Sequence, residues 1–236
     1  MASDSKTSRP QHADMMIKIC GMRDPDNIAA VASLTPMLMG FIFHEASPRD
    51  ASGLDPDVIK SLPPFIRPVG VFVDKSTDEV TSVCDRYGIK IVQLHGAESP
   101  AQCRELKEKG YTVFKATGIA DASDLKGLKE YEGNVDMFLF DTKSERHGGT
   151  GVKFDWGLLE TYDMDVPYLL SGGICEDDTD AIVEAMRPGM AGIDINSRFE
   201  TSPGIKDLNK LINFILSLRK FNEHEPNTTP FWEQKN

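Results

Sequence analysis

Cysteine is scarce in this chain, which has four in 236 residues. Cys20, Cys84, Cys103 and Cys175 are widely spaced, and no two of them form the C-x-x-C pair of a zinc site. Such few and scattered thiols exclude a disulfide framework like that of small secreted domains. Free thiols are typical of the reducing cytosol, and we therefore expect a cytoplasmic protein.

Long apolar runs are also missing. No stretch approaches the ~18 apolar residues of a membrane-spanning helix, and residues 1–14 lack the apolar centre of a secretory signal. We expect residues 1–14 to be a disordered leader and residues 221–236 to be a polar C-terminal tail. Residues 15–220 then form one domain, which is long enough to bury a sizeable core.

Basic residues are outnumbered, with 26 Lys and Arg against 37 Asp and Glu and a net charge of −11. Nucleic-acid backbones and anionic membranes attract basic faces, so we expect neither as a partner. A small anionic substrate is compatible with this charge if local hydrogen-bond donors hold it. The histidines show no H-x-H or H-E-x-x-H spacing, so we expect no metal site.

What the chain does contain is a series of short, β-rich apolar runs with little polar alternation, as in parallel strands covered on both faces. Eight such runs predict strands at 16–20, 38–43, 68–73, 89–95, 112–116, 137–141, 168–171 and 192–195. Amphipathic stretches between and after them predict helices at 27–33, 58–62, 76–87, 99–110, 121–131, 155–162, 176–186 and 205–218. Asp24-Pro25 and Asp55-Pro56 each place an N-cap residue before a proline suited to the first helical turn.

Eight strand–helix units, beginning about every 20 to 30 residues, predict an α/β fold of the (β/α)8 or TIM-barrel type in a single domain. A doubly wound open sheet is the alternative. Its dinucleotide-binding form carries G-x-G-x-x-G after the first strand, whereas the first run here ends in Cys20-Gly21-Met22-Arg23. In the preferred barrel, function is expected at the carboxyl ends of the strands.

Two of these strand ends predict a phosphate site. Gly172 and Gly173 follow the seventh run, where a backbone without side chains lets N–H groups approach phosphate oxygens. Asn196 and Ser197 follow the eighth run, where barrel phosphate sites have their second wall. A Gly-Gly pair alone is commonly a plain turn, but the two loops together favour phosphate binding.

An acid is predicted at Asp141, which closes an apolar run. Partial desolvation there raises a carboxyl pKa and suits the group to proton donation near neutral pH. A helix cap or a salt bridge to Lys143 is the alternative. The glycine-rich segment 148–151 that follows is either a lid or a plain connection.

Cys20 and His95 also close apolar runs, and each has two interpretations. Cys20 is either a small buried hydrophobe or a thiolate activated by the neighbouring Lys18 and Arg23. His95 either polarises a substrate or orients a neighbour, or it is a hydrogen-bonded structural residue. The other three cysteines fall on predicted helices and are expected to be structural.

Six short motifs lie at and between the strand ends. They are Lys18-Ile19-Cys20-Gly21, Gly70-Val71-Phe72-Val73, Gln93-Leu94-His95-Gly96, Phe140-Asp141-Thr142-Lys143, Gly148-Gly149-Thr150-Gly151 with Phe154-Asp155-Trp156, and Ser171-Gly172-Gly173-Ile174. In this order they resemble the phosphoribosylanthranilate isomerase family, and the resemblance extends from about residue 16 to residue 218.

The resemblance implies a TIM-barrel enzyme of tryptophan biosynthesis that converts N-(5-phosphoribosyl)anthranilate into 1-(2-carboxyphenylamino)-1-deoxyribulose 5-phosphate. This Amadori rearrangement needs no cofactor. By resemblance, Asp141 is the general acid that protonates the furanose ring oxygen, and Cys20 is the general base that takes the C2′ proton. A carboxylic acid suits a poorly basic ether oxygen, and a thiolate accepts a carbon-bound proton near neutral pH.

The resemblance also implies the contacts to this small phosphosugar. Arg49 matches an arginine expected near the anthranilate carboxylate, and Gln93 and His95 belong to the substrate site. The phosphate would lie on Gly172, Gly173, Asn196 and Ser197. A monomer or a homodimer is expected.

Two segments depart from the family's pattern. After strand eight the family commonly reads Asp-Val-Ser-Ser-Gly-Val-Glu, whereas this chain has Asp194-Ile195-Asn196-Ser197-Arg198-Phe199-Glu200. Asn196 still offers hydrogen bonds, while Arg198 in place of glycine changes the loop or adds a cation near the phosphate. The segment 43–49, which ends in Arg49, departs from the usual Lys/Ser-Lys-Arg pattern.

Two other functions are alternatives to this one. A dual-substrate isomerase that also acts on a histidine-pathway intermediate generally uses two aspartates, and Cys20 stands where one of them would be. A catalytically silent phosphate-binding barrel would be expected to lack Cys20 or Asp141, and both are present.

Overall fold

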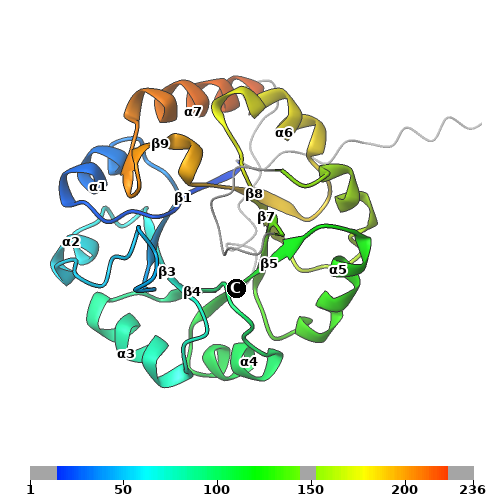
Figure 1. Cartoon of the computed structure of the whole chain (residues 1–236), viewed down its shortest axis with the longest axis horizontal. Coiled ribbons are helices and arrows are strands. Elements are labelled where there is room, and N and C mark those ends of the chain that lie inside the picture. Colours follow the sequence, from blue (N-terminus) through cyan, green and yellow to red (C-terminus); the bar gives the residue numbers. More distant parts are fainter. Residues whose placement is uncertain (1–14, 144–152, 223–236) are drawn as a thin grey trace, which may run out of the picture.

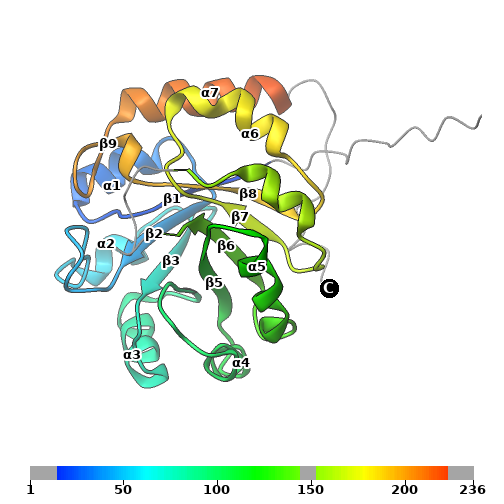
Figure 2. The same cartoon turned by 45° about the vertical axis from the view of Figure 1, so that its right-hand side comes forward.

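The computed structural model describes residues 15–143 and 153–222. The expected leader (1–14), the glycine-rich segment 148–151 and most of the expected tail (223–236) lie outside these residues. In the described part, eight parallel strands form a closed barrel with helices on its outside (Figures 1 and 2), which confirms the predicted (β/α)8 fold.

The strands follow one another around the barrel in chain order, and β8 pairs with β1 to close it. They are β1 Met16–Ile19, β2 Leu38–Ile42, β3 Arg67–Phe72, β4 Ile91–Leu94, β5 Thr112–Ile119, β6 Met137–Thr142, β7 Tyr168–Leu170 and β8 Met190–Ile195. Each overlaps a predicted strand. The closing pair is in register from Met16 with Gly192 to Ile19 with Ile195.

Helices cover the outside of the barrel (Figure 1). The α-helices are α1 Pro25–Ala32, α2 Pro56–Lys60, α3 Thr77–Tyr87, α4 Pro100–Glu108, α5 Ala122–Lys126, α6 Thr179–Ala185 and α7 Leu208–Asn222. Short 3-10 helices are η1 Gly127–Tyr131, η2 Trp156–Thr161, η3 Glu176–Asp178 and η4 Ser197–Phe199. The predicted N-caps of α1 and α2 are confirmed, because the Asp24 and Asp55 side chains accept hydrogen bonds from the first turns.

Four predicted helices differ from the structure. The segment 176–186 begins as the 3-10 helix η3 and becomes α6 only at Thr179. The segment 155–162 forms the 3-10 helix η2, as short helical pieces often do. The segment 121–131 changes from α5 to η1 at Gly127, a weak helix former. The last helix begins at Leu208 rather than at 205, because Ile205–Lys206 form strand β10 of a hairpin with β9 (Glu200–Ser202). It continues to Asn222, two residues into the expected tail.

The buried apolar residues form two layers. One fills the barrel interior with side chains from most of the strands, including Met16, Ile91 and Leu139. The other lies between the strands and the helices. Side chains alternate between the two faces of a strand, so the residues two positions beyond the interior layer also point into the barrel, nearer its carboxyl end. No described helix is long and apolar enough to cross a membrane.

Candidate active site

Strand alternation brings polar side chains into the carboxyl end of the barrel. Lys18, two residues after Met16, is fully buried, and its Nζ lies 2.9 Å from Asp194 Oδ1 across the β1–β8 pair. Cys20 comes two residues later, and its backbone N–H donates to Ile195 O (2.9 Å), which extends the pairing of these strands. The first and last strands of the barrel thus place a thiol directly above a buried ion pair.

The Cys20 thiol is buried, and Gly40 on β2 makes room for it. A Cβ at Gly40 would lie 2.7 Å from Cys20 Sγ and 3.1 Å from Lys18 Nζ. Burial raises the pKa of the Cys20 thiol, and the opposing effect of Lys18 does not cancel it. Burial by itself would lower the pKa of Lys18, but Asp194 and Cys20 outweigh it and the pKa is raised. The free protein therefore holds a neutral thiol beside an ammonium group.

Only one of the two cations expected beside Cys20 is there. Lys18 interacts with the thiol, whereas Arg23 Nη1 donates to Pro48 O at 2.7 Å. The expectation that Arg23 activates Cys20 is therefore wrong, because Arg23 follows the turn at Gly21, whose φ is +78°, and is directed to the segment after β2.

Asp141 lies in β6 with its carboxyl largely buried. Burial raises the pKa of this carboxyl to about 6, against the lowering effect of the hydrogen bond from Thr142 N–H (2.8 Å). His95 Nε2 lies 3.6 Å from Asp141 Oδ2. The alternative salt bridge to Lys143 is not formed, because Lys143 pairs with Asp124 at 2.7 Å. Asp141 is therefore protonated in part of the molecules near neutral pH.

Gln93 lies in β4 two residues before His95 and is 1% exposed. Its Nε2 lies 3.4 Å from His95 Nδ1, while its Oε1 has no hydrogen-bond partner among the described residues. A buried carbonyl oxygen without a donor costs free energy. Gln93 Oε1 is thus suited to accept a hydrogen bond from a ligand hydroxyl.

The loop after β7 packs tightly against the end of β6. Gly172 and Gly173 have φ values of +90° and +68°, a region that favours glycine. A Cβ at Gly172 would lie 2.7 Å from Thr142 N and 3.1 Å from Asp141 Oδ1. The backbone of the predicted phosphate loop therefore runs directly beside the predicted acid.

Residues after β8 form the other wall. Asn196 precedes the short helix η4, and Lys206 Nζ donates to its Oδ1 (2.7 Å) and its O (3.3 Å). Ser197 begins η4 and is half-buried, while Arg198 beside it is exposed. The loops after β7 and β8, which the sequence links to phosphate, thus belong to neighbouring strands that pair in the barrel.

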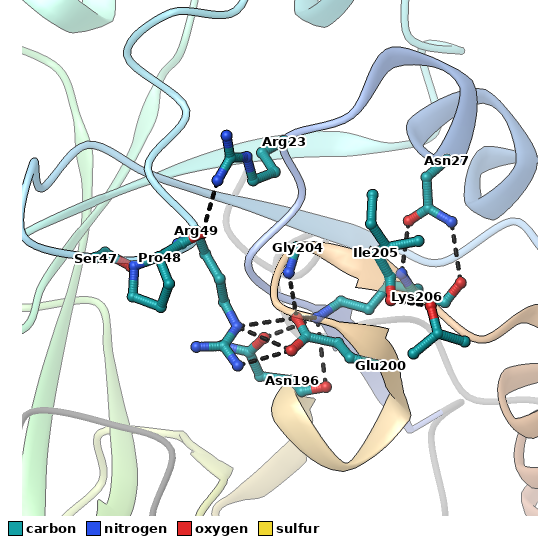
Figure 3. A network of polar contacts seen from close by, with 11 residues as sticks. Arg23, Asn27, Ser47, Pro48, Arg49, Asn196, Glu200, Gly204, Ile205 and Lys206 are labelled. Carbon is teal, nitrogen blue, oxygen red and sulfur yellow. Dashed lines mark hydrogen bonds and ion pairs between the residues drawn. The ribbon is translucent and has the colours of Figure 1, made fainter.

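Arg49 reaches this wall from the segment after β2 (Figure 3). Its Nε donates to both carboxylate oxygens of Glu200 (2.9 and 3.1 Å), and its Nη2 donates to Oε2 at 2.7 Å. Glu200 also accepts from Lys206 Nζ at 2.6 Å. Although burial alone would raise the pKa of Glu200, these two cations lower it, so its carboxylate is ionised. Arg49 and Asn196 are held together in one polar network.

Comparisons with known proteins identify the family of this chain. A family model described as N-(5'phosphoribosyl)anthranilate (PRA) isomerase matches residues 17–217. The chain belongs to this family. Its fold and its general class, an isomerase, are those that the sequence motifs predicted.

Relatives named N-(5'-phosphoribosyl)anthranilate isomerase support the PRA isomerase assignment. The protein from Parabacteroides distasonis is 44% identical over 203 residues, which cover 85% of this chain and 92% of the relative. The one from Phocaeicola vulgatus is 40% identical over 206 residues, covering 87% and 98%.

Solved PRA isomerases share the architecture. The Thermotoga maritima enzyme has a TM-score of 0.78 at 29% identity, covering 87% of this chain and 99% of that one. A second crystal structure, of a PRA isomerase in complex with reduced 1-(o-carboxyphenylamino)-1-deoxyribulose 5-phosphate, has a TM-score of 0.75 at 27% identity over the same shares.

The sequence did not reveal the partners that hold this site in place. Glu200 and Lys206 lie in a segment where only a loop and the start of a helix were predicted, yet both side chains are buried. A local signal was available: two opposite charges flank Gly204, a residue with φ +85° that is suited to a hairpin turn. Their contacts to Arg49 and Asn196 depend on the fold.

We expect Gly172→Ala to weaken both the fold and the site. The alanine must adopt a positive φ and push its Cβ into Thr142, so the free energy of unfolding should fall by more than the roughly 1 kcal/mol of strain alone. Gly110→Ala is the matched control, since Gly110 has φ +87° but nothing within 4 Å of a built Cβ. Urea unfolding and KM measure the effects. Equal losses of stability and an unchanged KM in both variants would contradict the close packing at Gly172.

Proposed function

We propose that the protein catalyses the isomerisation of N-(5-phosphoribosyl)anthranilate to 1-(2-carboxyphenylamino)-1-deoxyribulose 5-phosphate in tryptophan biosynthesis. The observation that carries the proposal is that two groups lie at the carboxyl end of the barrel: the Asp141 carboxyl, whose pKa is near 6, and the buried Cys20 thiol beside Lys18. Family membership supplies the substrate. We place the reaction in the cytoplasm, which agrees with four free cysteines.

Asp141 begins the reaction as the general acid. Its proton passes to the furanose ring oxygen, the bond from that oxygen to C1′ breaks, and the nitrogen lone pair forms the Schiff base. Desolvation of Asp141 keeps this proton available near neutral pH. His95, within 3.6 Å, orients the carboxyl.

Cys20 completes the reaction as the general base. Its thiolate takes the C2′ proton, and the electrons of that bond form the enolamine while the Schiff base is neutralised. The enolamine then tautomerises to the ketone. Product and substrate are isomers, so the steps consume no oxidant or other reactant. Lys18 offers a countercharge to the thiolate.

The ends of the substrate have separate anchors in this proposal. Backbone N–H groups at Gly172 and Gly173, with Asn196 and Ser197, bind the phosphate. The guanidinium of Arg49 binds the anthranilate carboxylate, and Gln93 Oε1 accepts from a sugar hydroxyl.

The direct test follows the loss of phosphoribosylanthranilate fluorescence with purified protein free of host enzyme. Turnover that requires both Cys20 and Asp141 supports the proposal. A folded protein that leaves the fluorescence unchanged, and that does not isomerise the substrate in a coupled assay, would overturn it. Monomer or homodimer remains a prediction that sedimentation tests separately.

We expect Arg49→Met to weaken the carboxylate anchor and to leave the phosphate anchor largely intact. Loss of a charge-assisted contact worth about 1.5–3 kcal/mol should weaken inhibition by anthranilate by about tenfold or more. Inhibition by inorganic phosphate, which uses the other loops, should change much less. Arg86→Met is the control, because Arg86 lies over Tyr87 on α3, away from the site. An unchanged inhibition constant for anthranilate would remove Arg49 from the carboxylate site.

A further inference from the structure

Lys206 is a buried lysine whose ammonium faces the site rather than solvent. Its side chain has no exposed surface. The Nζ donates to Glu200 Oε1 (2.6 Å), Asn196 Oδ1 (2.7 Å) and Asn196 O (3.3 Å), as Figure 3 shows. All three acceptors belong to the segment after β8, so the ammonium fixes both the backbone and the side chain of Asn196.

The same cation acts on Arg49 through a shared partner. Glu200 divides its carboxylate between Lys206 Nζ and the guanidinium of Arg49, whose Nη1 takes no part in these bonds. The carboxylate therefore sets the plane of the guanidinium, since a bidentate pair fixes direction as well as distance. One lysine thus fixes two residues, Arg49 and Asn196, which reach the barrel end from opposite sides of β1.

Gly21 shows how close this network is to Cys20. A Cβ at Gly21, the residue after Cys20, would lie 2.7 Å from Arg49 Cδ and 2.7 Å from Asn196 Oδ1. Arg49 and Asn196 therefore pack on the backbone that carries the thiol. Three charged groups of the described residues influence the pKa of Cys20: Lys18 on β1 and Lys206 on β10 lower it, and Asp194 on β8 raises it.

The hairpin that carries Lys206 has an anchor of its own. The Lys206 backbone N–H donates to Asn27 Oδ1 (2.8 Å), and Asn27 Nδ2 donates to Lys206 O (3.0 Å), which ties the hairpin to α1. Because both bonds use only the backbone of residue 206, they hold it in place without a charge at the end of its side chain. A buried ammonium is costly unless it is fully paired, so the fold alone does not explain why a lysine stands here.

We infer that Lys206 is a positioning residue whose buried ammonium holds Asn196 and, through Glu200, Arg49 in fixed places around Cys20. The naming of the two anchors as phosphate and carboxylate contacts rests on the proposed function. In that reaction Lys206 aligns both charged ends of one substrate with the base that must reach its C2′ proton.

The test compares Lys206→Met with Asn27→Ala. Methionine keeps the unbranched shape and removes the charge, whereas Asn27→Ala removes two hydrogen bonds to the backbone of the same residue and leaves the ammonium. We expect Lys206→Met to raise KM and to weaken inhibition by inorganic phosphate and by anthranilate, each by about tenfold. Asn27→Ala should lower the urea midpoint and leave these constants within about twofold.

A second readout does not depend on the substrate. The rate of Cys20 alkylation by iodoacetamide, followed peptide by peptide in mass spectra with Cys175 as internal reference, reports the thiolate fraction. Removing a nearby cation should move the inflection of the Cys20 profile about one pH unit higher in Lys206→Met. Asn27→Ala should leave the profile unchanged, because a purely structural loss does not alter the charges around the thiol.

These readouts separate the inference from the proposed function. Wild-type inhibition constants and a wild-type alkylation profile in folded Lys206→Met would overturn the positioning role. Wild-type protein without isomerase activity, but with both shifts in the variant, would overturn the proposed function and keep the inference. In Lys206→Met the Glu200 carboxylate keeps Arg49 as its counterion. If that variant does not fold, Lys206→Gln, which offers Asn196 and Glu200 an amide donor but no charge, should show the same shift in the Cys20 alkylation profile; its absence overturns the inference.

Discussion

Asp141→Asn is expected to lose turnover by about 10²–10⁴-fold, the usual contribution of general acid catalysis. The carboxamide keeps the volume of the carboxyl and still accepts the Thr142 N–H, but it has no acidic proton to give the ring oxygen. The loss should fall mainly on kcat, and the fluorescence assay measures it. Turnover within a few-fold of wild type would exclude Asp141 as the acid.

The same variant should be more stable than the wild type above pH 6. Burial raises the carboxyl pKa from 3.8 to about 6 in the folded protein, so folding favours the protonated form. Wild-type stability therefore falls as the pH rises from about 4 to about 6 and beyond, by an amount on the order of 3 kcal/mol. The asparagine carries no such cost, and urea unfolding at pH 4 and pH 8 reveals the difference.

Asp136→Asn is the matched control for both effects. Asp136 directly precedes β6, at the end of the strand opposite Asp141, where it accepts the Val113 N–H at 2.9 Å and pairs with Lys107 at 3.0 Å. Full turnover and no gain in stability are expected there. An inactive Asp136→Asn would mean that any disturbance of β6 stops the reaction.

Cys20→Ser is expected to lower turnover by a similar factor. Comparison of its pH profile with that of the wild type should reveal an unusual order of ionisation in the wild-type site. The reaction needs a thiolate and a protonated carboxyl, yet burial puts the pKa of Cys20 above that of an ordinary thiol, about 8.5, and the pKa of Asp141 near 6. The active form of the free enzyme is therefore a small fraction of the molecules at every pH.

The shape of the pH profile follows from these two pKa values. Below pH 6, kcat/KM should rise about tenfold per unit, because the thiolate fraction grows while Asp141 stays protonated. Between the two pKa values, growing thiolate offsets the loss of protonated Asp141, which gives a plateau. Above the pKa of Cys20 the rate falls, since only the protonated carboxyl still changes. The acidic break thus reports Asp141, and the alkaline break reports Cys20.

Cys84→Ser is the control for Cys20→Ser. It also replaces a buried thiol, on α3, and should leave both breaks in place. The substrate phosphate ionises near pH 6 as well, but that ionisation is the same for every variant. A wild-type rate and a wild-type alkaline break in Cys20→Ser would assign the base to another residue, and His95 would be tested next.

Local patterns predicted the strands and half of the site. Because parallel strands of one barrel end at the same face, the polar residues Cys20, His95 and Asp141 could be placed together from their positions after apolar runs. The N-cap pairs at Asp24 and Asp55 were equally local. What the sequence could not show is the ion pairing of Arg49 with Glu200, because 151 positions separate them and only the closed barrel brings them into contact.

The pairing of β1 with β8 has a consequence for the life of the protein before it is folded. The contact between Lys18 and Asp194 spans 176 positions, and such long-range pairings form slowly during folding. Until β8 has been synthesised and docked, the Cys20 thiol is exposed and has the ordinary, lower pKa of an unfolded chain. Thiolates that are accessible are the ones that oxidants attack. The cysteine proposed to perform the chemistry is therefore most open to oxidative damage in the nascent or unfolded chain, and closing the barrel protects it.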